Sequence, residues 1–335
     1  MKRIASLFLA LALTLSLTAC TAPAEKADDG KLQIVTTLFP YYDFARAIAQ
    51  ARADVTLLLS PGREAHSFEP TPLDAVTISE ADVFLYNGGE GEYWVESMLD
   101  AAGEHIAVAS RMMDYVDALN EEYVEGMQGA DGHDHDHEHG SHDDHDHDHE
   151  EDEHDSDEIE YDEHIWTSPK NAVVLCRAVC DAICRADAEN AAFYRANCEN
   201  YCAQLEDLDA RFAALCESAP RRLLIFADRF PMLYFCREFG LDYRAAFHGC
   251  SGDTEPSLAT IKFLIDKVED ENIPVVYTID FGTKKVAAVV SECTGAAIET
   301  LYSMQTVSRA DFDAGETYLT LMERNFEALR KGLNA

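Results

Sequence analysis

Short apolar runs alternate with amphipathic stretches over the first third of the chain. Runs rich in β-branched and aromatic side chains, which are typical of strands, fall at residues 32–37, 54–59, 83–86 and 105–109. Helical patterns lie between them, at residues 41–50, 72–79 and 94–102. Strands that alternate with helices predict βαβ units and a mostly parallel sheet.

The same alternation returns in the last third of the chain. The predicted strands cover residues 223–226, 243–247, 274–278 and 297–301. The predicted helices cover residues 231–239, 257–271, 284–294 and 315–333. We therefore expect a second lobe of the same α/β type.

Two helices are predicted between these series. The first has Ser168 as its N-cap and Pro169 at its first position, and it runs to Arg185. The second, residues 188–217, has an apolar stripe with alternating spacings of four and three, and it spans about 45 Å. The predicted fold is α/β, with two lobes that each hold a mostly parallel sheet, a long rigid helix that joins them, and a cleft between them.

The chain divides into seven predicted segments. They are a lipoprotein signal peptide (1–20), a tether (21–31), an N-terminal α/β lobe (32–130), a disordered metal-collecting loop (131–163), the remainder of the N-terminal lobe (164–187), a linking helix (188–218) and a C-terminal α/β lobe (219–335).

The first segment has the pattern of an export signal. Lys2 and Arg3 precede an apolar run at residues 4–17, and Leu-Thr-Ala then precedes Cys20. A cysteine at this point fits a bacterial lipoprotein processing site, which would leave Cys20 as a lipidated N-terminus. We expect an exported, extracytoplasmic protein that is anchored to the bacterial cell membrane through Cys20.

Nine further cysteines would remain in the mature chain. Five of them follow helical spacing, and the chain has no CxxC pair: Cys176, Cys180, Cys184, Cys198 and Cys202. We interpret most of the nine as small buried apolar side chains. Disulfide formation in an exported protein, and metal ligation, remain alternatives.

Residues 131–163 form the most unusual stretch of the sequence. They contain 9 of the 13 histidines and 18 acidic residues, but no Lys or Arg, in a chain whose formal net charge is −37. Such a stretch has no apolar face to bury, so it predicts a mobile, solvated loop. Imidazole beside carboxylate is a ligand set for divalent transition metals, with zinc the leading candidate. The predicted low-affinity ligands are His133, His135, His137, His139, His142, His145, His147, His149 and His154.

A tighter site is predicted from residues near the ends of strands. His66 lies in a loop after a predicted strand, His164 directly precedes a helix, and His248 follows a strand of the second lobe. Asp228 and Asp280 lie at strand ends of the second lobe. Two imidazoles and two carboxylates would balance a divalent charge, although spacing alone does not select among these side chains.

Several motifs together resemble the substrate-binding lipoproteins of zinc and manganese ABC importers, the ZnuA/TroA type. They are Val35-Thr36-Thr37-Leu38-Phe39-Pro40, Pro61-Gly62 with His66-Ser67-Phe68-Glu69-Pro70, Asn87-Gly88-Gly89 with Trp94, His164-Ile165-Trp166 with Ser168-Pro169, Phe193-Tyr194 with Asn197 and Tyr201, and Glu255-Pro256-Ser257. The resemblance implies that His66 and His164 are metal ligands from the first lobe. It also implies that the linking helix keeps closure of the lobes small.

The second lobe departs from the family pattern. Asp228 stands where the family usually has a His or Glu ligand, so it is the best candidate for the third ligand. The stretch Leu301-Tyr302-Ser303-Met304 lacks the Asp that often supplies the fourth ligand. Asp280, His248 or water would take that place.

We interpret the protein as a monomeric, extracytoplasmic lipoprotein that binds Zn²⁺ and delivers it to an ABC permease and its ATPase. Mn²⁺ is a less suitable cargo because it prefers oxygen ligands, whereas Ni²⁺ or Co²⁺ is not excluded. A surface metal-buffering protein or an adhesin is an alternative. An enzyme is not expected, because the sequence lacks HExxH and a nucleophile elbow. Nucleic acid is an improbable partner for so acidic a chain.

Deletion of residues 132–155 tests the predicted division of labour between the loop and the cleft. We expect calorimetric titration to show one tight zinc site in the deletion variant, with a lower total zinc stoichiometry than in the full-length protein, because weak loop sites must order the chain to bind. Loss of the tight site with the loop would contradict this interpretation.

Overall fold

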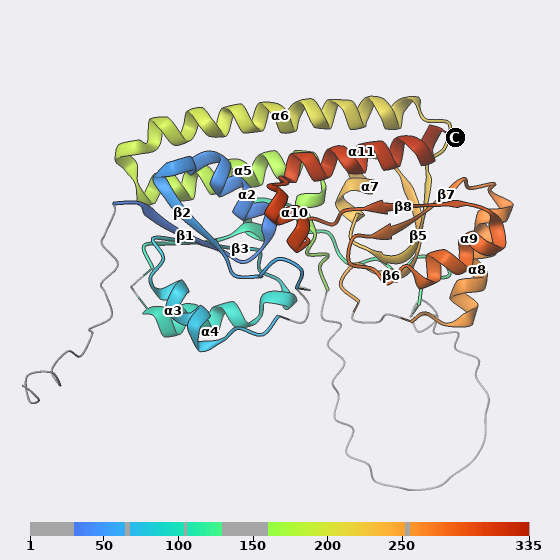
Figure 1. Cartoon of the computed structure of the whole chain (residues 1–335), viewed down its shortest axis with the longest axis horizontal. Coiled ribbons are helices and arrows are strands. Elements are labelled where there is room, and N and C mark those ends of the chain that lie inside the picture. The colour runs from blue at the N-terminus through green and yellow to red at the C-terminus, as the bar shows by residue number, and fades with distance from the viewer. Residues whose placement is uncertain (1–29, 64–67, 104–105, 129–159, 252–254, 335) are drawn as a thin grey trace, which may run out of the picture. The chain divides into compact units, whose positions relative to one another are not determined.

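Eight strands form two parallel, four-stranded sheets in this computed structural model (Figure 1). The structure describes residues 30–63, 68–103, 106–128, 160–251 and 255–334. The first sheet has the order β2-β1-β3-β4, with β1 Leu32–Thr36, β2 Ala53–Leu57, β3 Val83–Tyr86 and β4 Val108–Arg111. The second has the order β6-β5-β7-β8, with β5 Leu223–Phe230, β6 Asp242–His248, β7 Val275–Ile279 and β8 Ala297–Leu301. The predicted α/β fold with two parallel sheets is confirmed.

Helices cover both faces of each sheet (Figure 1). On one face of the first sheet lie α2 (Phe39–Ala49) and α5 (Pro169–Ala186), and on the other lie α3 (Pro72–Ser79) and α4 (Trp94–Ala102). The second sheet is flanked by α7 (Leu233–Phe239) and α11 (Tyr318–Asn334) on one side and by α8 (Leu258–Asp270) and α9 (Lys285–Thr294) on the other.

The long helix α6 (Ala191–Ser218) extends along both sheets and is the predicted linking helix (Figure 1). It has 28 residues and follows a 3-10 turn, η7 (Ala188–Asn190). Its buried residues belong to one hydrophobic core that contains residues of both sheets, from Leu32 and Ile34 to Tyr277 and Leu301. The two sheets therefore share one continuous core.

Most helix ends agree with the sequence signals. Ser168 caps α5 by accepting a hydrogen bond from the Asn171 backbone N–H at 3.1 Å, as predicted. The structure differs from the predictions at β4, which begins three residues late, and at α10 (Arg309–Ala314), a short helix that was not predicted. It also differs at β5, which continues to Phe230 across a register shift between Phe226 and Arg229.

One buried carboxylate joins three of the helices that cover the sheets. Asp43 on α2 is 5% exposed and accepts hydrogen bonds from the Tyr201 hydroxyl on α6 at 2.6 Å and from the Tyr318 backbone N–H on α11 at 3.0 Å. Burial raises the pKa of Asp43, although the hydrogen bonds from Tyr201 and Tyr318 act in the opposite direction. The group therefore links α6 to α2 and α11 from the inside.

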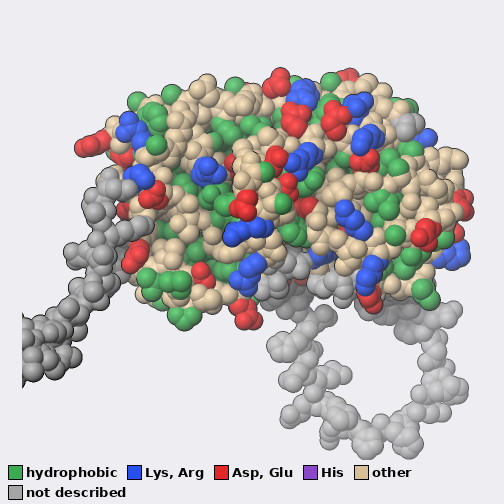
Figure 2. Space-filling model, in the orientation of Figure 1, with side chains coloured by type: hydrophobic (Ala, Val, Ile, Leu, Met, Phe, Trp, Pro, Cys, Tyr) green, Lys and Arg blue, Asp and Glu red, His purple; other side chains and the backbone are tan. Residues whose placement is uncertain are grey.

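On the outer surface, basic and acidic side chains lie next to one another (Figure 2). Arg211 on α6 forms a bidentate ion pair with Glu323 on α11, and Lys331 on α11 pairs with Glu299 on β8 at 2.8 Å. Exposed pairs of this kind contribute less than about 1 kcal/mol each. Stability therefore depends mainly on the shared core.

No helix among the residues that the structure describes is both long enough and apolar enough to cross a membrane.

Replacement of Asp43 tests the internal link between the helices. Asp43→Ala should lower the free energy of unfolding by about 3 kcal/mol, because it leaves two buried donors without their acceptor. Urea denaturation of the metal-free protein measures this change. The matched control is Asp181→Ala, at an exposed aspartate of α5, which should stay within about 0.5 kcal/mol of wild type. Equal effects of the two substitutions would show that Asp43 does not stabilise the fold.

Candidate metal centre

The segment from Asp162 to Ser168 lies between the two sheets, and every residue in it is buried. It enters α5 through a 3-10 turn, η6 (Ile165–Thr167). The Trp166 indole N–H donates to the Ser303 carbonyl oxygen at 2.7 Å, and the Tyr318 hydroxyl donates to the Trp166 carbonyl oxygen at 2.7 Å. Both partners come from the second half of the chain. The segment is therefore fixed from the side of the second sheet.

The imidazole of His164 is 1% exposed and has a carboxylate partner. Its Nδ1 lies 3.0 Å from Oδ1 of Asp162, which also accepts the His164 backbone N–H at 2.8 Å. An ionised carboxylate only accepts, so Nδ1 carries the proton in the neutral ring and the lone pair lies on Nε2. Burial acts to lower the pKa of His164, but the negative charges of Asp162, Glu121 and Glu163 outweigh it and raise the pKa.

The second lobe approaches the same ring closely at Gly249. A Cβ atom at Gly249 would lie 3.1 Å from Nδ1 and Cε1 of His164 and 2.9 Å from the Phe230 carbonyl oxygen. Contacts this short require a residue without a side chain. The loop after β6 therefore packs directly on the imidazole.

A glycine-rich turn after β3 supports the residue before His164. The Glu163 carboxylate accepts the Gly91 backbone N–H at 2.8 Å, and a side chain at Gly89 would overlap that carboxylate. Gly89 also has φ +91°, a conformation that favours glycine. The Asn87 side chain accepts from the Tyr41 hydroxyl and donates to the Glu163 carbonyl oxygen at 3.0 Å. The turn Asn87-Gly88-Gly89 therefore holds the residue before His164 in place and supplies no candidate ligand itself.

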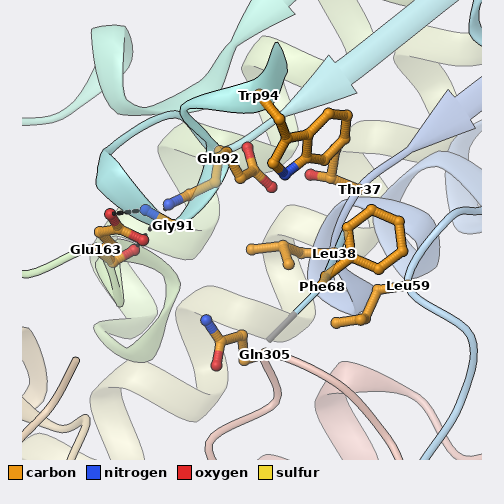
Figure 3. A pocket seen from close by; sticks show the side chains of 10 residues that line it. Thr37, Leu38, Leu59, Phe68, Gly91, Glu92, Trp94, Glu163 and Gln305 are labelled. Carbon is orange, nitrogen blue, oxygen red and sulfur yellow. Dashed lines mark hydrogen bonds between the residues drawn. The ribbon is translucent and has the colours of Figure 1, made fainter. Parts of the chain in front are cut away.

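A small pocket lies beside Glu163, where the loops after β1 and β3 diverge (Figure 3). Its lining includes the polar side chains of Thr37, Glu92 and Trp94, together with those of Asn87, Glu163 and Gln305. Burial, aided by the nearby charge of Glu163, raises the pKa of Glu92 to about 7, although its Oε2 accepts the Gly88 backbone N–H at 2.8 Å. The pocket is lined by Thr37, Leu38, Leu59, Phe68, Asn87, Gly91, Glu92, Trp94, Glu163 and Gln305. Trp94 and Trp166 are buried, at 6% and 0% exposure.

Two stretches far apart in sequence pair next to His164. The Asp162 backbone N–H donates to the Leu119 carbonyl oxygen at 2.9 Å, and the Glu121 backbone N–H donates to the Glu160 carbonyl oxygen at 2.8 Å. The Tyr234 hydroxyl donates to the Asp162 carbonyl oxygen at 2.8 Å and accepts the Leu119 N–H at 3.0 Å. This antiparallel pairing brings Glu121 to the side of the site on which the second lobe lies.

Glu121 and His248 meet at this position. The Glu121 carboxylate is 4% exposed, accepts the Cys250 backbone N–H at 3.1 Å, and lies 3.7 Å from Nδ1 of His248. Burial acts to raise the pKa of Glu121, but contacts with His248 and Cys250 and the charge of His164 lower it overall. The pKa of His248 is raised, chiefly by Glu121. Sequence reasoning did not identify Glu121, since nothing separates it from the many other acidic residues nearby.

Asp228 and Asp280, the two carboxylates that the sequence predicts as ligands, contact residues of the second lobe. Asp228 lies within β5 at the register shift, where its carboxylate accepts the Arg229 backbone N–H at 2.9 Å and packs against Gly282. Asp280 follows β7 and accepts the Ser303 backbone N–H at 3.1 Å. Burial raises the pKa of Asp280 to about 6. The strongest charges that act on His164 come from Asp162, Glu121 and Glu163, not from these two aspartates.

Several predicted site residues lie outside the described residues. These are His66, the lipidation residue Cys20 and the nine histidines of the 131–163 stretch. Within the described part of the chain, His164, Glu121 and His248 do not bring three ligand atoms within 4.8 Å of one another. A complete site therefore needs a further ligand or a small rearrangement of the Glu121–His248 pair.

Comparison with known proteins identifies the family of the chain. The model of the ZnuA family, described as zinc-uptake complex component A, periplasmic, matches residues 34–332. The high-affinity zinc uptake system protein ZnuA of Bacillus subtilis is 30% identical over 339 residues, which cover 99% of this chain and 98% of that protein.

Two further comparisons concern AdcA of Streptococcus pneumoniae. This zinc-binding lipoprotein is 30% identical over 334 residues, and the match covers 99% of this chain but only 61% of AdcA. The crystal structure of the Zn(II)-bound ZnuA-like domain of AdcA superposes with a TM-score of 0.71 at 25% identity, covering 91% of this chain and all of that domain. Because the family model spans both sheets and α6, the chain belongs to the ZnuA family of periplasmic zinc-uptake components.

Proposed function

We propose that this protein is the extracytoplasmic substrate-binding component of an ABC importer and that it binds Zn²⁺ between its two sheets. The observation that carries the proposal is His164, which is buried, oriented by Asp162, and in contact with both halves of the chain. Membership of the ZnuA family supports zinc as the cargo. Mn²⁺ remains the less suitable alternative, because imidazole is a better ligand for zinc.

The proposed ligand set begins with Nε2 of His164 and the side chain of His66. Glu121 and His248 are the strongest candidates to complete it, because they contact each other and Glu121 acts directly on the charge of His164. Asp228 and Asp280, the candidates from the sequence, are not among the groups whose charges act most strongly on His164. The three imidazoles of His164, His66 and His248 and the carboxylate of Glu121 would form a tetrahedral zinc site.

Within this site the protein works by binding and not by catalysis. Asp162 holds the His164 ring so that Nε2 faces the ion, and Gly249 leaves space for the ring against the second lobe. Closure replaces water on the ion with protein ligands. Release to a permease and its ATPase then requires the two sides of the site to separate. Anchoring through lipidated Cys20 would keep the protein near that permease.

Substitutions in a variant that lacks residues 132–155 distinguish the proposed ligands Glu121 and His248 from the alternatives Asp228 and Asp280. His164→Ala should lower zinc affinity by roughly 100-fold or more, and Glu121→Gln and His248→Ala each by about 10-fold or more. Asp228→Asn and Asp280→Asn serve as matched controls and should change the affinity by less than about threefold. Calorimetric titration with Zn²⁺ and with Mn²⁺ measures all five variants.

A reversed result would contradict this ligand set. If Asp228→Asn abolishes tight binding while Glu121→Gln leaves it intact, the third ligand is Asp228. If the protein binds Mn²⁺ more tightly than Zn²⁺, the proposed cargo is wrong.

Closure on zinc should be small, because the two sheets share one core and the Trp166 indole is bonded across them. Small-angle scattering of the loop-deleted protein should show a change in radius of gyration below about 1 Å when zinc is added. Trp166→Phe removes the bond to Ser303 and part of the indole packing against Tyr41 and His164, and should increase hydrogen exchange near residues 303–305. A change of several ångströms in the wild-type radius would contradict a rigid link.

A further inference from the structure

Five cysteines gather where α5 packs against α6, away from His164. Cys176, Cys180 and Cys184 lie on α5, and Cys198 and Cys202 lie on α6. All five are buried, at 0% to 7% exposure. The proposed zinc-binding function uses none of them.

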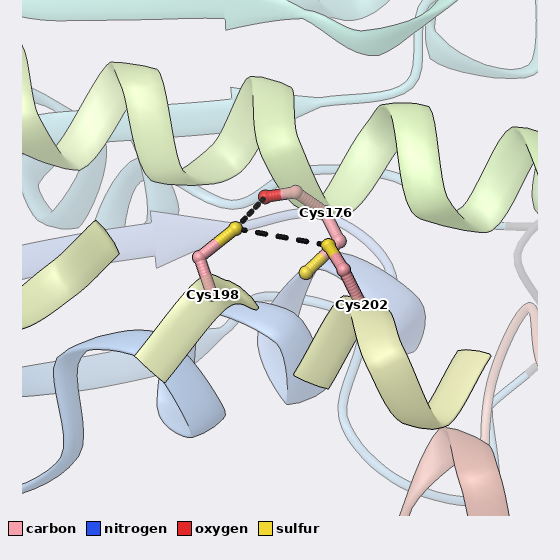
Figure 4. A group of neighbouring side chains, drawn as sticks. All are labelled: Cys176, Cys198 and Cys202. Atoms are coloured by element: carbon pink, nitrogen blue, oxygen red, sulfur yellow. Dashed lines mark hydrogen bonds between the residues drawn. The ribbon is translucent and has the colours of Figure 1, made fainter. Parts of the chain in front are cut away.

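Three of these sulfurs turn toward one another between the helices (Figure 4). Cys176, Cys198 and Cys202 form the one group, among the residues that the structure describes, in which three potential ligand atoms all lie within 4.8 Å of one another. The Cys198 and Cys202 sulfurs are 3.8 Å apart. Sulfurs bound at about 2.3 Å around one ion are separated by about 3.8 to 4 Å. The spacing therefore fits ligation without a large movement of the helices.

Cys180 and the cation of Arg177 also lie next to this group of three cysteines. Cys180 lies within hydrogen-bonding reach of the Cys198 thiol and 4.0 Å from the Cys184 sulfur. The Cys198 thiol donates a hydrogen bond to the Cys176 backbone carbonyl oxygen at 3.8 Å, and this proton would leave when the sulfur binds an ion. The guanidinium of Arg177 acts on both Cys198 and Cys202 and is held by Glu206 at 3.1 Å.

We propose that Cys176, Cys198 and Cys202 form a second metal site, distinct from the site at His164, that binds one divalent d¹⁰ ion such as Zn²⁺ through three thiolates. Soft thiolate ligands select this class of ion. Binding of the ion displaces three thiol protons and leaves one net negative charge, which Arg177 compensates. Cys180 is positioned to supply a fourth sulfur.

This site would fasten α5 to α6. Since α5 follows directly from the His164 segment, and α6 extends along both sheets, the ion would stabilise the scaffold of the cleft and would not exchange with the cargo. Because the sulfurs are buried, we expect the ion to bind as the chain folds and to leave slowly.

Cadmium is a suitable probe, because only thiolate ligands give Cd²⁺ an intense charge-transfer absorption in the ultraviolet. The mature protein is unfolded under reducing conditions with a chelator, freed of the chelator, and refolded with Cd²⁺. One equivalent should produce the absorption, with three protons released, in wild type and in Cys216→Ala. Cys216 is the matched control, a buried cysteine of α6 that is not in the group.

Cys198→Ala and Cys202→Ala should each lose the absorption but keep the far-ultraviolet circular dichroism and the zinc affinity of the His164 site. Retention of the absorption in these variants would overturn the proposal, as would its absence from refolded wild type. Thiol titration of the protein as isolated, in denaturant without reductant, should find all nine mature cysteines reactive after the metal is removed. Fewer reactive thiols, restored by reductant, would mean that the α5–α6 sulfurs form disulfides and not a metal site.

Discussion

The buried segment from Asp162 to Ser168 is the constraint on which the rest of the site depends. Its carbonyl and N–H groups have left water, so each must find a partner inside the protein. Those partners come from both halves of the chain, including Asn87 on one side and Tyr234 and Ser303 on the other. As a result, the position of the His164 imidazole is determined by the whole fold and not by its own loop.

The two sheets are also joined to each other by hydrophobic packing and by buried hydrogen bonds. The largest hydrophobic core contains residues of both sheets and of α6, and a smaller core packs against each sheet separately. Asp43 adds a hydrogen-bonded link inside that core between α2, α6 and α11. Wide opening would expose apolar surface at a cost of about 25 cal/mol for each square ångström. At the proposed site, small local movements around Glu121, His248 and Gly249 would admit and release an ion without exposing that surface.

The candidate site concentrates negative charge around His164. Asp162, Glu121 and Glu163 are all nearly buried and all act on His164. Buried carboxylates are costly without a cation, so their concentration here favours a bound divalent ion. The backbone N–H groups of Gly91 and Cys250 donate to the carboxylates of Glu163 and Glu121 and hold them in position.

The sequence alone determined the α/β class, the alternation of strands and helices and the long linking helix, because hydrophobic period and capping residues are local properties, and its motifs made His164 a candidate ligand by resemblance. The tertiary structure decided what meets His164. Glu121 reaches it only through the pairing of residues 119–121 with residues 160–162, and His248 only because β6 ends beside that pair. The register shift in β5 likewise placed Asp228 within a strand, not after one. Contacts of this kind depend on chain segments brought together by the shared core, so no local pattern in the sequence records them.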